Sequence, residues 1–131
     1  MTEQKQFNGI APFFFVQSLS QSLDYYCDTL GFERPKLWGD PPTFAMPHRD
    51  NFIIMLKQVS EGQTIATNGS QGNWDAYVWI EDADILYKEV KDRGATIDYE
   101  PCIQSEYDMK EFAVVDPDGY LIAFGEHVQQ S

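Results

Sequence analysis

The chain is 131 residues long, with 43% hydrophobic residues, 15% aromatic residues and a formal net charge of −12 at pH 7. This length predicts one domain over residues 1–131, and the hydrophobic content is enough for a buried core. A strongly acidic chain repels phosphate backbones and attracts cations, so we expect no nucleic-acid partner.

The first half of the sequence predicts a strand, a helix and further strands. "APFFFV" (11–16) is a strand candidate. Apolar residues then recur at helical spacing: Leu19, Leu23, Tyr26 and Leu30. Gly31 suits the end of this helix, and Ser20 or Ser22 is the expected cap at its start. "DNFIIMLKQ" (50–58) reads as another strand.

The second half repeats this order after a polar, glycine-rich linker at 59–73. "DAYVWI" (75–80) is a strand candidate. A helix should follow, with Asp82 or Asp84 as its cap and Gly94 just past its end. "EFAVVDPDGYLIAFGE" (111–126) then predicts two strands joined by a tight turn at Asp-Pro-Asp-Gly.

These matches predict an internal duplication. Val16 aligns with Ile80, Gly31 with Gly94, and residues 50–58 with residues 118–126. The expected modules are residues 9–58 and 74–126, each built as a strand, a helix and further strands.

Strand alternation divides the side chains of both modules into two faces. The face expected to pack under the helices holds Phe14, Val16, Ile54, Leu56, Val78, Ile80, Ile122 and Phe124. The opposite face, here called the open face, holds Ala11, Phe13, Phe15, Met55, Asp75, Tyr77, Trp79 and Ala123. If the two sheets curve toward each other, the open-face residues line a cleft.

The cysteine content and the start of the sequence indicate where in the cell the protein is expected. Cys27 and Cys102 are the only cysteines, and there is no charged leader followed by an apolar run. We therefore expect a cytoplasmic protein with reduced thiols. No apolar stretch is long enough to span a membrane, and His48 and His127 do not form a spaced metal motif.

The segments "LDYYCDTLGF", "WDAYVWIEDADILYKEVKDRGA" and "EFAVVDPDGYLIAFGE" resemble the glyoxalase/bleomycin resistance protein/dioxygenase superfamily, also called vicinal-oxygen-chelate proteins. The resemblance covers about residues 9–126. It implies an α+β fold of two tandem βαβββ modules forming an open, cup-shaped sheet, and it also implies a homodimer.

Enzymes of this family hold a divalent metal with one residue early in each module's first strand and one in each last strand. The resemblance places these four positions on Ala11, Met55, Asp75 and Ala123. Alanine cannot coordinate a metal, and a thioether is a poor ligand for hard or borderline ions. Because Asp75 alone supplies an oxygen, we expect no metal site, no cofactor and no metal-dependent catalytic residues.

The remaining cup residues suggest a ligand site instead. An aromatic cavity with one or two carboxylates suits a planar or cationic molecule. The candidate ligand-binding residues are Phe13, Phe15, Trp38, Met55, Asp75, Tyr77, Trp79, Tyr107, Met109 and Glu111.

Three functions remain open. The first is a metal-free binding protein, resembling the bleomycin-resistance branch, that sequesters a small molecule. The second is a metal-dependent lyase or dioxygenase with a non-standard site. The third is a structural relative whose cup is filled by side chains, since aromatic strand residues often belong to a core.

Overall fold

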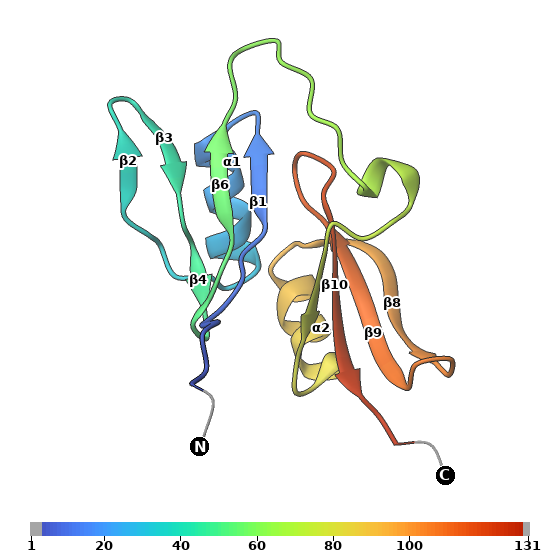
Figure 1. Cartoon of the computed structure of the whole chain (residues 1–131). Helices are drawn as coiled ribbons and strands as arrows, with labels where there is room; N and C mark the ends of the chain where they lie inside the picture. Colours follow the sequence, from blue (N-terminus) through green and yellow to red (C-terminus); the bar gives the residue numbers. More distant parts are fainter. Residues whose placement is uncertain (1–3, 130–131) are drawn as a thin grey trace.

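The computed structural model describes residues 4–129; the expected domain's ends, 1–3 and 130–131, lie outside the described residues. Two four-stranded sheets stand beside each other (Figure 1). The first consists, in spatial order, of β1 (Phe13–Val16), β6 (Met55–Gln58), β3 (Pro42–Ala45) and β2 (Leu37–Gly39). The second consists of β7 (Ala76–Trp79), β10 (Leu121–His127), β9 (Met109–Val115) and β8 (Thr96–Gln104).

The two sheets share one pattern of strand pairing. In each, the first strand of the module pairs in parallel with the last, β1 with β6 and β7 with β10. The described pairings between neighbouring strands are otherwise antiparallel, including a short extra ribbon of β4 (His48–Arg49) and β5 (Phe52–Ile53). The predicted α+β architecture of two similar modules with an open sheet is confirmed.

The cap of the first module's helix lies earlier in the chain than the two serines that the sequence suggested. Ser18 has an extended backbone, and its hydroxyl accepts a hydrogen bond from the backbone N–H of Gln21, so Ser18 is the cap rather than Ser20 or Ser22. The helix runs as α1 (Leu19–Leu23) and continues as the π-helical turn η1 (Asp24–Thr29). Gly31 ends it with φ +79°, a conformation that glycine adopts without strain.

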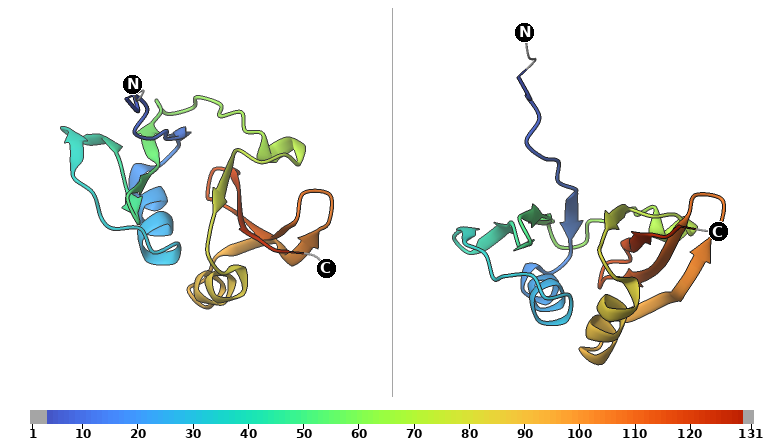
Figure 2. Two further views of the ribbon diagram at one scale, coloured as in Figure 1. Left: turned by 60° about the horizontal axis from the view of Figure 1, so that its bottom comes forward. Right: turned by 90° about the horizontal axis from the view of Figure 1, so that it is seen from below.

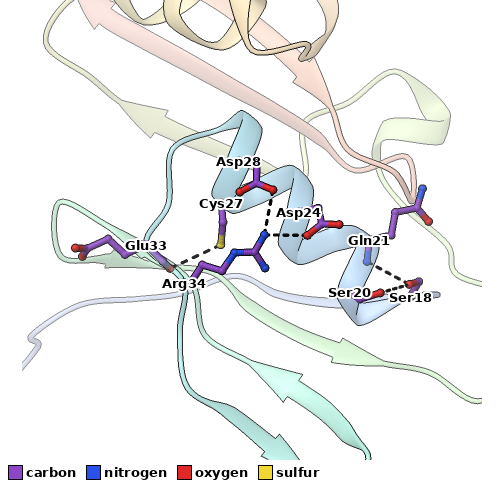
Figure 3. A network of polar contacts seen from close by, with 8 residues as sticks. All are labelled: Ser18, Ser20, Gln21, Asp24, Cys27, Asp28, Glu33 and Arg34. Atoms are coloured by element: carbon purple, nitrogen blue, oxygen red, sulfur yellow. Dashed lines mark hydrogen bonds and ion pairs between the residues drawn. The ribbon is translucent and has the colours of Figure 1, made fainter.

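An ion-pair cluster lies on the outer side of this helix (Figure 3). Arg34 bridges Asp24 and Asp28, at 2.9 Å and 3.0 Å. All three side chains are more than half exposed, so these contacts add little to stability. We interpret the cluster as a surface feature that ties the loop after η1 to the helix.

The second helix follows its predicted signals closely. Asp82 caps α2 (Ala83–Asp92) by accepting a hydrogen bond from the N–H of Ile85. Gly94 follows its end with φ +99°. Within residues 4–129, no helix is long and apolar enough to cross a membrane.

Both helices lie on the same side of the two sheets (Figure 2), where a single core joins the modules. Six of the eight residues predicted to pack under the helices are buried in this core, and the other two, Val78 and Ile80, are partly buried and pack against it. The rings of Phe14 and Tyr120 stack with centroids 4.0 Å apart across the module boundary. The opposite faces of both sheets are therefore the ones available for a site.

Candidate functional site

The open face of the second sheet carries a cavity of about 410 Å³. It is lined by Trp74, Tyr77, Trp79, Tyr107 and Met109. Tyr77 and Trp79 come from β7, Met109 begins β9, Tyr107 lies in the turn before β9, and Trp74 lies in the loop before β7. Four of these five residues, all but Trp74, were candidates from the sequence.

A buried carboxylate lies beside this cavity. Glu111 is 1% exposed. One of its oxygens accepts hydrogen bonds from the hydroxyls of Tyr77, at 3.1 Å, and Tyr107, at 2.8 Å. The other accepts from the Tyr99 hydroxyl at 2.6 Å, and the Trp74 indole N–H donates to that same hydroxyl at 3.0 Å. Three phenols thus satisfy a carboxylate that would be costly to bury alone.

These phenols keep their protons across the physiological pH range. Burial, followed by the hydrogen bond to Glu111 and its charge, raises the pKa of Tyr107 to about 12. Burial is also the largest cause for Tyr77 and Tyr99, whose pKa values are raised further, with Glu111 again contributing. The three hydroxyls therefore act as stable donors to one acceptor.

Gly125 makes this network possible. It pairs with Glu111 on one side and Trp79 on the other, at the middle of the second sheet. A Cβ atom at this position would lie 1.9 Å from the Tyr77 hydroxyl oxygen and 3.0 Å from the terminal methyl of Met109. The absence of a side chain at Gly125 lets the Tyr77 ring cross β10 and reach Glu111.

Asp75, expected as an unpaired carboxylate of the cavity, has a full set of backbone partners. Its oxygens accept hydrogen bonds from the N–H groups of Asn68, Gly69 and Leu121, at 2.7 Å, 2.9 Å and 2.8 Å. Asn68 and Gly69 belong to the linker and to the 3₁₀ turn η2 (Gly69–Gln71). Asp75 therefore fastens the linker to the start of β10, and we assign it a structural role.

The remaining candidates lie on the first sheet. In the part of the chain that the structure describes, Phe13, Phe15, Trp38 and Met55 do not line the cavity of the second sheet. Phe13 and Phe15 are about half exposed, and their rings lie 5.4 Å apart, edge to face. Phe44, which the sequence did not single out, contacts both Phe13 and Trp38. These aromatic side chains form a surface on the first sheet that is separate from the cavity of the second sheet.

Strand pairing also tests the four positions where family enzymes hold a metal. Phe13, rather than Ala11, lies opposite Met55, and Tyr77 lies opposite Ala123. The positions expected from the sequence include one carboxylate, that of Asp75, whose oxygens already accept hydrogen bonds from backbone N–H groups. The positions assigned by strand pairing include none. Among residues 4–129, His, Cys, Asp and Glu side chains do not gather in any group of three that could hold an ion. The side chains at these positions do not fit a divalent metal.

Tyr99 and Trp74 are the functional candidates that the sequence-derived set lacks. Strict alternation along β8 would put Tyr99 on the same face as Ile97. A register shift between these residues instead places Ile97 opposite core residue Val114, and Tyr99 opposite Ala113 on the open face. Trp74 precedes β7, and its hydrogen bond to Tyr99 depends on that shift.

A second hollow, of about 550 Å³, lies elsewhere and is polar. Arg49 in its wall forms a two-point ion pair with Glu89 of α2 and donates to the backbone oxygen of Leu30. These bonds explain Arg49 as a link between the modules.

Comparison with known proteins identifies a matching family and several similar proteins. The family model described as "Glyoxalase/Bleomycin resistance protein/Dioxygenase superfamily" matches residues 7–124. A bleomycin resistance protein of Geobacillus stearothermophilus is 26% identical over 133 aligned positions, which cover 87% of this chain and 92% of that protein.

Solved structures agree on the fold. TioX from Micromonospora sp. ML1 aligns with a TM-score of 0.73 and 16% identity, covering 93% of this chain and all of that one. The bleomycin-binding protein of Streptomyces verticillus, solved in complex with copper(II)-bleomycin, aligns with a TM-score of 0.66 and 21% identity, covering 97% of this chain and all of that one.

Proposed function

Since the chain belongs to the glyoxalase/bleomycin resistance protein/dioxygenase superfamily, we propose that it binds and sequesters a small aromatic or cationic molecule without using a metal. Its relatives include proteins named for bleomycin resistance, and one structural neighbour binds copper(II)-bleomycin. These names support a binding function in the same branch of the family.

The observation that carries the proposal is the aromatic cavity with a carboxylate beside it. Aromatic rings that only formed a packed core would leave no cavity between them. Here Trp74, Tyr77, Trp79 and Tyr107 instead surround a cavity of about 410 Å³. Open apolar pockets with a few placed polar groups are typical of small-molecule sites. The acidic chain adds a field that draws cations toward it.

We also propose that the binding unit is a homodimer. The aromatic surface of the first sheet, formed by Phe13, Phe15, Trp38 and Phe44, is partly exposed in the single chain. Exposed apolar patches of this kind are typical of interaction surfaces. If a second copy docks on this surface, the aromatic residues of the first sheet, together with Met55 on the strand beside Phe13, would lie at or near the subunit boundary.

The test is a binding measurement on the full chain. Two of the three tryptophans, Trp74 and Trp79, line the cavity, so a bound ligand should change the intrinsic fluorescence. We expect metal-free bleomycin, copper(II)-bleomycin or a planar aromatic cation to give saturable calorimetric heats and a matching fluorescence change. Absence of saturable binding for every compound in such a panel would overturn the proposal.

The alternative of a metal-dependent lyase or dioxygenase makes a different prediction. It requires a divalent ion held by the protein, although the side chains at the four family positions do not fit one. Metal analysis of untagged protein separates the two functions. Stoichiometric zinc, nickel, iron or manganese would favour the enzyme.

A further inference from the structure

We propose that the cavity of the second sheet is an aromatic cage for a methylated ammonium group. This inference rests on the proposed binding function and narrows its ligand class. The cage residues are Trp74, Tyr77, Trp79, Tyr107 and Met109.

The rings are inclined to one another as the walls of a cage must be. Trp74 and Tyr77 have centroids 4.7 Å apart and planes at 59°. Tyr77 and Trp79 have centroids 5.4 Å apart and planes at 55°. Tyr107 meets Trp74 edge to face at 82°, with a centroid distance of 6.4 Å. Inclined rings that line one cavity can turn more than one face toward a molecule inside it, and a cation is attracted to the face of an aromatic ring.

The carboxylate supplies charge without supplying a contact. Both oxygens of Glu111 are occupied by phenol hydroxyls, and its side chain is buried. The negative charge of Glu111 therefore attracts a cationic ligand across the rings of Tyr77 and Tyr107, and the ligand does not form a direct ion pair with the carboxylate. Hydroxyls that donate toward Glu111 also direct their positive ends away from the cavity.

This arrangement selects against a primary amine. A primary ammonium carries three N–H donors, and each loses its water on entry. The atoms lining the described cavity are mostly apolar, so these donors would gain few acceptors. A trimethylammonium group has methyl groups in place of these donors and spreads its charge over them. It therefore keeps the attraction to the rings and avoids the desolvation cost of unpaired N–H groups.

Three probes of similar shape test this selectivity: choline, ethanolamine and the uncharged carbon analogue 3,3-dimethylbutan-1-ol. Each is titrated into the full chain while tryptophan fluorescence and heat are recorded. We expect choline to bind at least about tenfold more tightly than either of the others, as a desolvated cation–π contact allows. Equal or tighter binding of ethanolamine, equal binding of the neutral analogue, or no choline binding up to tens of millimolar would each overturn the cage.

Variants test which residues are responsible for choline binding. Trp79→Leu removes a ring that is 75% exposed, so it should weaken choline binding about tenfold without unfolding the chain. Glu111→Gln removes the charge and also one of the two acceptor oxygens that the phenols use, so it should weaken the binding of choline more than that of the neutral analogue. Phe52→Leu, an exposed aromatic on β5, and Glu100→Gln, an exposed carboxylate on β8, are the matched controls. Equal losses in the controls would contradict the assignment.

Gly125→Ala offers a test that removes no cage residue. The added Cβ would collide with the Tyr77 hydroxyl, so the ring must move and the cage must open. Loss of choline binding with a retained folding transition is the expected result, and unchanged binding would count against the cage geometry.

The inference and the proposed function fail in different ways. If bleomycin or a planar aromatic cation binds but choline neither binds selectively nor competes with it, the cage is wrong and the binding function stands. If neither those compounds nor the three probes bind, both proposals fall.

Discussion

At the scale of single residues, Asp75 shows how a candidate ligand-binding residue can have a structural role. Its three backbone donors come from the linker and from the start of β10, segments that are distant in sequence. A local sequence pattern cannot predict hydrogen bonds between segments so far apart, so the sequence could predict only the face on which Asp75 lies.

We predict that Asp75→Asn destabilises the fold by about 1 to 3 kcal/mol, because an amide offers one acceptor oxygen where the carboxylate offers two. Chemical denaturation of wild type and variant gives the difference in the free energy of unfolding. Asp98→Asn, an exposed position on β8, is the control and should stay within about 0.5 kcal/mol of wild type. An Asp75 variant as stable as this control would contradict the structural role.

Glu111 and its neighbours show which site residues strand alternation can predict and which it cannot. Alternation placed Glu111, Tyr107 and Met109 toward one face, and the structure brings all three to the cavity or beside it. Tyr99 could not be found in this way, because a register shift in β8 reverses its face relative to Ile97. The sequence made Glu111 a candidate ligand-binding residue, whereas in the structure three phenol hydroxyls donate to its carboxylate.

At the scale of elements, the signals with local physical causes were the most predictable. The two left-handed glycines after the helices, the Asp82 cap and the Asp-Pro-Asp-Gly turn all lie where the sequence placed them. The cap of α1 was expected at Ser20 or Ser22 and lies at Ser18 instead, because all three serines have the side chain that a cap needs. Only the extended backbone at Ser18 distinguishes it.

The turn between β9 and β10 also joins the two modules. Asp116 is buried, and one of its oxygens accepts a hydrogen bond of 2.6 Å from the hydroxyl of Tyr26 in η1. Its other oxygen accepts the N–H groups of Asp118 and Tyr120. Burial outweighs these bonds and raises the pKa of Asp116 from 3.8 to about 6.

This shift predicts how stability depends on pH. A carboxyl with a raised pKa in the folded state holds its proton more tightly there than in the unfolded chain. Its contribution to stability is therefore fully present below about pH 4 and is lost as the pH rises through about 6. The total loss is on the order of 3 kcal/mol, at about 1.4 kcal/mol for each pKa unit.

Comparison with Asp116→Asn isolates this effect from that of the other acidic residues. The free energy of unfolding is measured by urea titration between pH 4 and 7 for both proteins. We expect the stability of wild type relative to the variant to fall across this range. A difference that stays constant with pH would show that Asp116 does not titrate there.

At the scale of the whole molecule, the sequence predicted the architecture because a duplication repeats every element signal twice. What it could not predict is how the two open faces sit relative to each other. The aromatic surface of the first sheet and the cavity of the second belong to separate sheets, although alternation alone grouped their residues into one lining. Module arrangement depends on packing between distant segments, such as Phe14 against Tyr120.

The last prediction concerns the state of assembly. If a second copy covers the first-sheet aromatic surface, a charge placed there must lose its water on association and should oppose it. We expect wild type to be a two-fold dimer at micromolar concentration, the commonest closed assembly, and Phe15→Glu to shift it toward monomer. Light scattering coupled to size-exclusion chromatography gives the molecular mass. The fold should survive this change, because Phe15 is 46% exposed in the single chain and lies outside the core.

Phe52→Glu is the matched control, since Phe52 is 69% exposed but lies on β5 of the separate ribbon. It should leave the mass unchanged. The dimer proposal also couples assembly to binding, so the Phe15 variant should lose affinity for any ligand that contacts both copies while the cage of one chain stays intact. A monomeric wild type across micromolar concentrations would remove the dimer, and a monomeric variant with undiminished affinity would show that each chain binds its ligand alone.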